Sequence, residues 1–116
     1  RIGSCVREGI NTTFHSDFTM APAEPLNSAW VAVNRKNHTG EIMAPEERVT
    51  QEQALAAITI NAAHVIGFAN ETGSIRAGKM ADFTILEEDP IKCDPMELRD
   101  IPIRATVFEG NVFPTG

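Results

Sequence analysis

The sequence predicts a mixed α/β fold in which a strand and two helices are followed, from about Gly67, by short strands. Up to that glycine the apolar residues recur with the period of an α-helix. Beyond it they fall in short β-branched and aromatic runs. The 116 residues are enough for one domain with a modest core. We therefore divide the chain into a β/α half, residues 1–66, and a β half, residues 67–116.

The β/α half is predicted to begin with a short strand. Residues 9–16 are rich in β-branched and aromatic side chains, and Asp17 then opens a loop with two prolines. From Leu26 to Val33 the apolar side chains have helical spacing, and Pro25 suits the first turn of a helix. Residues 34–45 are polar and contain a glycine, so we expect them to form a loop.

The second predicted helix has the clearest signal in the chain. Thr50 and Gln53 have the spacing of a capping box, in which each side chain bonds to the other residue's backbone amide. The apolar face that follows consists of Ala54, Leu55, Ile58, Ala62, Val65 and Ile66. Gly67 supplies the stop signal, so one helix is expected from about Thr50 to Ile66.

The β half is predicted to be a mainly antiparallel unit. Residues 81–86 and 103–108 have the composition of strands, and residues 73–75 suggest a turn and a brief strand. Gly110 and Asn111 indicate a two-residue hairpin before Val112 and Phe113. Four side chains are expected in the core: Leu55, Phe83, Ile85 and Val107.

Composition excludes several kinds of partner. The formal net charge is −6, and the lysines and arginines are scattered, which argues against nucleic acid and anionic membranes. No run of about 18 apolar residues exists, so no membrane span is expected. Cys5 and Cys93 form no CxxC pair and are predicted to be unreactive thiols. We expect a cytoplasmic location.

One motif resembles a nucleotide-binding loop but lacks its chemistry. Residues 73–80 match the pattern GxxxxGK, yet Met80 stands where a serine or threonine hydroxyl must hold magnesium. Such a loop also opens a helix whose N-terminus receives the phosphate, whereas a strand is predicted here. The sequence therefore argues against nucleotide binding.

The candidate catalytic residue is Asp17, at the end of the first predicted strand. In β/α barrels the catalytic groups lie at the C-terminal ends of strands, and a carboxylate there can bind a metal and accept a proton. His15 would lie on the same face of an extended strand. Taken alone, an aspartate after a strand is also typical of a helix or turn cap. His38 and His64 are expected to be structural or solvated.

Several stretches, in order, resemble the C-terminal end of amidohydrolases of the amidohydrolase-3 type. They are Ser16-Asp17 with the proline-containing loop Ala21–Leu26, then Asn34-Arg35, Gln53–Ala63, Gly73–Phe83, Glu88-Asp89-Pro90 and Thr106–Val112. Gly73–Phe83 is the most specific, because it is close to the family's G-S-I-x-x-G-K-x-A-D signature. The chain departs from the family pattern at His15, where many relatives have glycine, and at Phe18-Thr19, where they have a small residue and proline.

The resemblance implies that residues 1–66 are the last β/α portion of a TIM-type (β/α)8 barrel and that residues 67–116 are part of a small β-sandwich. It implies one or two divalent metals, usually zinc, with Asp17 binding metal and shuttling a proton. On this interpretation the chain is the C-terminal segment of a longer enzyme. That enzyme would use metal-activated water to hydrolyse amide or cyclic amide C–N bonds, other than peptide bonds, in small molecules.

Such a segment lacks most of a barrel, so by itself it is expected to bind no metal tightly and to be inactive. Two apolar helix faces would lose their packing partner, and self-association is expected. These faces are Leu26, Trp30 and Val33, and Leu55, Ile58 and Val65. Two alternatives remain: a non-catalytic, self-associating binding or scaffolding module, and a small metal-binding protein that uses His15 and Asp17. An upstream His-x-His after a strand would favour the enzyme.

Overall fold

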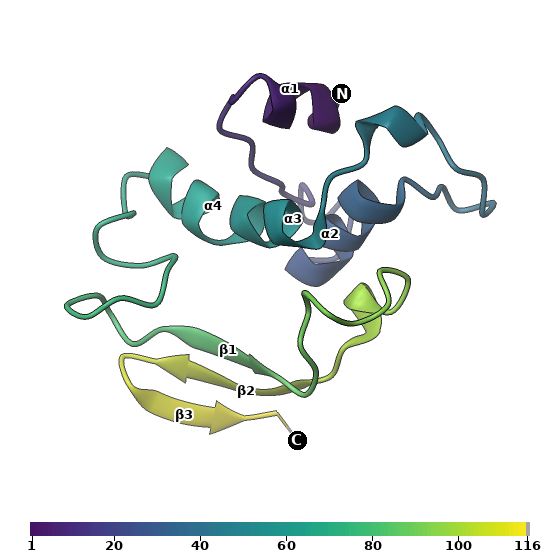
Figure 1. Cartoon of the computed structure of the whole chain (residues 1–116). Coiled ribbons are helices and arrows are strands. Elements are labelled where there is room, and N and C mark those ends of the chain that lie inside the picture. The colour runs from purple at the N-terminus through teal and green to yellow at the C-terminus, as the bar shows by residue number, and fades with distance from the viewer. Residues whose placement is uncertain (116) are drawn as a thin grey trace.

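The computed structural model describes residues 1–115 and places helices in the first part of the chain and a sheet in the second (Figure 1). The helices are α1 (Ile2–Arg7), α2 (Pro25–Asn34), α3 (Gln51–Ile58) and α4 (Ile60–Val65), with the 3-10 helix η1 (Pro45–Glu47) between α2 and α3. The strands are β1 (Phe83–Leu86), β2 (Ile103–Phe108) and β3 (Asn111–Pro114), with η2 (Leu98–Asp100) between β1 and β2. This order confirms the predicted mixed α/β organisation. Across residues 1–115 no helix has the length and apolar character needed to cross a membrane.

The predicted start of α3 is confirmed, but the predicted single helix is wrong. The Thr50 hydroxyl accepts from the amide of Gln53 at 3.1 Å, and the Gln53 side chain accepts from the amide of Thr50 at 2.9 Å. The helix is then interrupted at Thr59, whose φ of −126° and ψ of −97° are not helical. The Thr59 hydroxyl donates to the Leu55 carbonyl at 2.7 Å, a bond by which threonine competes with the helical backbone. Two shorter helices, α3 and α4, result.

The strand predicted at residues 9–16 is absent from the described structure. This segment is irregular, and its contacts with α4 include a bond from the Asn61 side-chain amide to the Thr12 carbonyl at 3.3 Å. A strand needs a neighbouring strand to pair its backbone groups, and residues 1–115 provide none at this position. The preceding helix, α1, was not indicated by the sequence.

The core forms between α2, α3 and η2. Trp30 and Leu98 are 5% and 0% exposed, and the Trp30 indole donates to the carbonyl of Met96 at 2.8 Å. The guanidinium of Arg99 lies 4.0 Å from the centre of the Trp30 ring, a cation–π distance. The buried cluster is Ala29, Trp30, Ala32, Val33, Val49, Ala54, Leu98 and Ile101. The connection between β1 and β2 therefore covers α2.

One of the two helix faces predicted to be bare is therefore buried. Trp30 and Val33 lie inside the chain, so the α2 face is not available for self-association, contrary to the prediction. The second face is only partly covered. Leu55 and Ile58 in α3 are half-buried, and Val65 at the end of α4 is 61% exposed. Self-association through the remaining apolar surface stays a prediction.

The sheet is antiparallel with strand order β1-β2-β3, as the sequence predicts. The turn between β2 and β3 is formed by Glu109 and Gly110, whose φ values are +49° and +81°. Positive φ at both positions is typical of the tight turns that match the twist of a hairpin. The turn lies one residue earlier than predicted, since Asn111 already pairs with Phe108 in the sheet.

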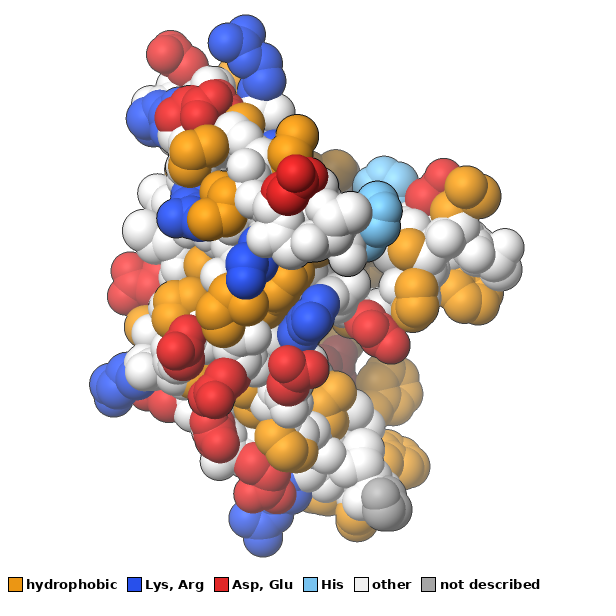
Figure 2. All heavy atoms as spheres, turned by 90° about the vertical axis from the view of Figure 1, so that its right-hand side faces the viewer, with side chains coloured by type: hydrophobic (Ala, Val, Ile, Leu, Met, Phe, Trp, Pro, Cys, Tyr) orange, Lys and Arg blue, Asp and Glu red, His pale blue; other side chains and the backbone are white. Residues whose placement is uncertain are grey.

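None of the four predicted core residues lies in the buried core, and Phe83 and Ile85 are the most exposed of them. They are 36% and 39% exposed, whereas Leu55 and Val107 are half-buried. Phe83 pairs with Val107 and Ile85 with Ala105, so these side chains share one face of the sheet. That face is apolar, but residues 1–115 leave it partly uncovered. Hydrophobic side chains reach the molecular surface in several places (Figure 2).

The loop between α4 and β1 is held together by Lys79. Its ammonium donates to the carbonyls of Ala69 and Thr72 and to the hydroxyl of Ser74, at 2.5, 3.1 and 2.6 Å. These three bonds use all three donors of the side chain. Lys79 thus has a structural role, which agrees with the argument against a nucleotide-binding loop. Gly73 and Ser74 form bends and Ile75 is irregular, so the predicted brief strand is absent.

A buried carboxylate attaches α1 to η1. Glu47 is 5% exposed, and it accepts hydrogen bonds from the hydroxyl and the amide of Ser4 at 2.5 and 2.7 Å. Gly3 permits this approach, because a Cβ at that position would lie 2.9 Å from the backbone of Glu47. The hydrogen bonds from Ser4, first that of its hydroxyl, lower the pKa of Glu47 below its usual value.

We expect Ser4→Ala to destabilise the protein most near neutral pH. The lowered pKa means that the Glu47 carboxylate stabilises the fold above its unfolded pKa of about 4.3, and that this contribution disappears as the pH falls through the folded pKa. The difference in thermal midpoint between wild type and Ser4→Ala should therefore shrink as the pH falls from about 7 to below about 4. Calorimetry at a series of pH values measures it. Ser28→Ala is the matched control, and a Ser4→Ala difference that is constant with pH would contradict the assignment.

Candidate functional site

Asp17 lies at a sharp turn between the irregular segment and the loop that leads to α2. Its φ is +52°, a left-handed conformation that aspartate tolerates better than most residues. The amide of Met20 donates to the Asp17 carbonyl at 2.7 Å and closes the turn. Asp17 is exposed, and within residues 1–115 its carboxylate forms no hydrogen bond or ion pair. The carboxylate is therefore available to a ligand or a proton.

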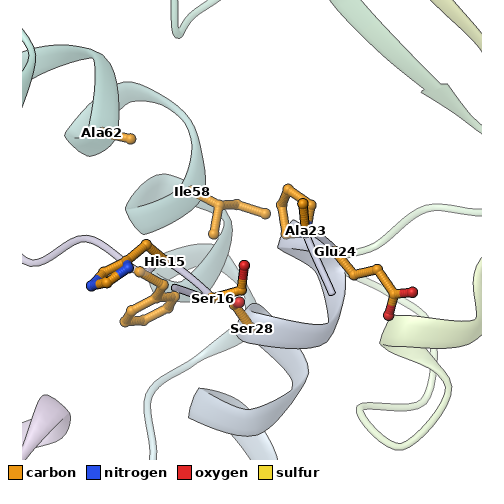
Figure 3. A pocket seen from close by; sticks show the side chains of 9 residues that line it. His15, Ser16, Ala23, Glu24, Ser28, Ile58 and Ala62 are labelled. Carbon is orange, nitrogen blue, oxygen red and sulfur yellow. The ribbon is translucent and has the colours of Figure 1, made fainter. Parts of the chain in front are cut away.

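His15 is the side chain that contacts Asp17. Its Nδ1 accepts a hydrogen bond from the Asp17 amide at 3.2 Å, whereas the extended strand expected to place both side chains on one face is absent. Because Nδ1 is the acceptor, a neutral ring carries its proton on Nε2. The ring is exposed and extends away from Ser16, the next residue (Figure 3).

A cavity of about 200 Å³ lies beside this turn. It is lined by Phe14, His15, Ser16, Ala23, Glu24, Pro25, Ser28, Ile58 and Ala62. Ser16 and Ser28 both line it, and the carboxylate of Glu24 extends away from them (Figure 3). Asp17 does not line the cavity. The polar side chains of the cavity are those of His15, Glu24 and the two serines, and the Asp17 carboxylate at the exposed turn stays the candidate proton acceptor.

The residues that the structure describes do not assemble a metal site. Nowhere in residues 1–115 do three or more histidine, cysteine, aspartate or glutamate side chains gather where they could hold an ion. Asp17 and His15 would supply at most two ligands, and protein-bound zinc normally has three or four. His38 and His64 are exposed on other elements, as predicted.

The two thiols offer no alternative chemistry. Cys5 and Cys93 are both free and half-buried. Burial raises the pKa of the Cys93 thiol, which keeps it protonated and poorly nucleophilic. The side-chain amide of Gln51 donates to the Cys93 carbonyl at 3.1 Å, so this part of the chain is bound to the start of α3.

Two apolar residues that follow Asp17 are exposed: Phe18 is 72% and Met20 is 83% exposed. Phe18 belongs to the Phe18-Thr19 pair at which the sequence departs from the family pattern. An exposed residue of this kind next to a candidate catalytic group indicates contact with a ligand or with another part of the protein.

Comparisons with known proteins show which family the chain resembles. Residues 1–114 match the sequence profile of the family described as "Amidohydrolase family". An N-substituted formamide deformylase from Arthrobacter pascens is 36% identical over 109 residues, which is 94% of this chain and 20% of that protein. An imidazolonepropionase from Shouchella clausii (strain KSM-K16) is 55% identical over 40 residues, which is 34% of this chain and 9% of that protein.

The fold is also that of a solved protein. An amidohydrolase from Thermotoga maritima has a TM-score of 0.74 and 19% identity, covering 98% of this chain and 26% of that one. This chain thus spans about a fifth of the formamide deformylase and about a quarter of the solved structure. With the family profile matched over almost every residue, the chain belongs to the amidohydrolase family.

Proposed function

We propose that this chain is the C-terminal part of a longer, metal-dependent amidohydrolase that hydrolyses C–N bonds of small amides or cyclic amides, other than peptide bonds. The observation that carries the proposal is Asp17, an exposed carboxylate at a sharp turn in a chain that matches the family over residues 1–114. The remaining catalytic residues would lie outside these 116 residues, since the chain spans about a fifth of its deformylase relative.

Two features support the proposed placement within a larger fold. Residues 9–16 have the sequence of a strand but no pairing partner in residues 1–115, as expected for the last strand of a (β/α)8 barrel without its neighbours. The sheet face with Phe83 and Ile85 is apolar and partly uncovered, as expected for half of a β-sandwich. We therefore propose that residues 1–66 complete a barrel and that residues 67–116 belong to the sandwich.

Hydrolysis requires a group that moves a proton. Water adds to the carbonyl carbon, the C–N bond breaks, and a proton from the water ends on the leaving nitrogen. We assign this transfer to Asp17, whose exposed carboxylate would accept the proton from water and deliver it to the nitrogen. A divalent metal, for which we propose zinc, would act as a Lewis acid and would lower the pKa of bound water to about 7. Asp17, with His15 as a second candidate, would be among its ligands.

The deformylase relative suggests the substrates to try first. Its name states that it deformylates N-substituted formamides, which are small amides. The full-length protein should release amine from such compounds, lose this activity after treatment with a strong chelator, and regain it with Zn²⁺. The isolated chain should neither hydrolyse them nor bind zinc tightly, because it provides at most two ligands.

Two results would contradict metal-dependent hydrolysis by the full-length protein. Turnover that withstands complete metal removal would argue against metal-dependent hydrolysis. A metal-loaded full-length protein that hydrolyses neither formamides nor cyclic amides would favour the alternative of a non-catalytic, self-associating module.

A further inference from the structure

The backbone of Asp17 has a conformation that its neighbours in the sequence do not enforce. Its φ of +52° is left-handed, a region that residues with a side chain enter at a cost in free energy. The turn that follows, residues 17–20, reads Asp-Phe-Thr-Met and contains neither glycine nor proline, the residues that most often fix a turn. Contacts to the peptide groups of Asp17 must therefore hold this conformation.

Two hydrogen bonds hold these peptide groups. The Asp17 carbonyl accepts from the Met20 amide at 2.7 Å, and this bond lies within the turn. The Asp17 amide donates to Nδ1 of His15 at 3.2 Å. This second bond connects the turn to the segment that precedes it, so the His15 side chain holds Asp17 from the N-terminal side.

The segment that carries His15 is anchored to the rest of the chain. Phe14 packs against the buried cluster, and the Thr12 carbonyl accepts from the side-chain amide of Asn61 in α4 at 3.3 Å. Residues 17–20, in contrast, are all exposed. His15 therefore links an anchored segment to an exposed turn.

We propose that His15 is a positioning residue for the reaction: its Nδ1 holds the Asp17 amide and thereby directs the Asp17 carboxylate at the reacting bond. The inference rests on the proposed function, in which this carboxylate moves the proton. It deepens that function by giving His15 a positioning role in place of that of a metal ligand. Proton transfer requires the carboxylate within hydrogen-bond reach of its partners, and small displacements lower the rate steeply. Rotation about the φ of Asp17 would cause such a displacement.

Asparagine and glutamine separate this role from the others that an imidazole could have. The Oδ1 of asparagine takes nearly the place of Nδ1 and can accept from the amide two residues later, as in an Asx-turn. The Oε1 of glutamine corresponds instead to Nε2, the nitrogen that remains for a metal ion or a substrate. His15→Asn should therefore keep the bond to the Asp17 amide, and His15→Gln should lose it.

The test measures kcat, KM and zinc content of the full-length enzyme, with an N-substituted formamide as the substrate. His15→Gln and His15→Ala should each lower kcat by about 3- to 30-fold and change KM by less than about twofold, because the bond orients the carboxylate and does not bind substrate. His15→Asn should keep kcat within about twofold of wild type. The zinc content per chain, measured by mass spectrometry, should be the same in all three variants.

Combined substitutions test whether His15 acts through Asp17. In an Asp17→Asn background, His15→Gln should change the remaining kcat by less than about twofold, because no carboxylate is left to position. The matched control is His38→Gln, the same chemical change at an exposed histidine in the loop between α2 and η1. It should change neither kcat nor zinc content.

Four results would overturn the inference and leave the hydrolase assignment intact. They are an unchanged kcat in His15→Gln, an equal loss of kcat in His15→Asn and His15→Gln, a lower zinc content in His15→Asn, and the full His15→Gln effect in the Asp17→Asn background. A wild-type enzyme without hydrolase activity would remove the basis for both. Thermal melts identify a variant that does not fold, and His15→Ala then takes the place of His15→Gln.

Discussion

Asp17→Asn in the full-length enzyme should leave folding intact and remove most of the turnover. Asparagine has nearly the same shape as aspartate and also tolerates the left-handed φ of +52°. Its amide cannot accept the proton from water, so kcat should fall by about 10²- to 10⁴-fold. Steady-state kinetics with an N-substituted formamide, together with a thermal melt of each variant, measures both parts of this expectation.

The control for this substitution is Asp100→Asn, which makes the same chemical change at a side chain that is 71% exposed beside Arg99. It should change neither kcat nor the melting temperature appreciably. Near-normal turnover in Asp17→Asn would contradict the catalytic role of Asp17. Loss of folding in place of activity would show that the aspartate acts as a turn-forming residue.

The largest effect on stability is expected from Leu98→Ala. Leu98 is completely buried in the cluster that joins η2 to α2, and its truncation removes apolar contacts and leaves a cavity. Truncating a buried leucine to alanine lowers the free energy of unfolding by about 2–5 kcal/mol. The free energy of unfolding, measured with denaturant, should fall by that amount.

Met96→Ala provides the comparison within the same segment. Its side chain is 40% exposed, and its hydrogen bond to Trp30 uses the backbone carbonyl, which the substitution retains. Met96→Ala should lower the free energy of unfolding by less than about 1 kcal/mol. Suppose that Leu98→Ala lowers the free energy of unfolding by no more than Met96→Ala does. The connection between β1 and β2 would then not be what stabilises α2.

The elements predicted correctly from the sequence are those determined by neighbouring residues. The capping box at Thr50 and Gln53 and the proline that begins α2 act within one helical turn, so they are visible in the sequence. The break at Thr59 is also local. It was missed because a threonine inside an apolar helical pattern gives no sign that its hydroxyl will compete with the backbone.

The other wrong predictions concern features that depend on residues far away in the chain or outside it. Trp30 and Leu98 are separated by most of the chain, and no pattern around either one indicates the other. The strand expected at residues 9–16 requires neighbours that residues 1–115 do not contain. For the same reason the sequence points to Asp17 and His15, which are two residues apart, but to no distant group that would act with them.

Lys79 sets a limit on how the loop between α4 and β1 can change during evolution. Surface loops usually accept insertions and deletions, because few of their backbone groups depend on a fixed spacing. Here one ammonium must reach acceptors at Ala69, Thr72 and Ser74 simultaneously. Adding or removing a residue between Ala69 and Lys79 would separate at least one acceptor from the amine. The loop is therefore free to vary in the identity of its exposed side chains but not in its length.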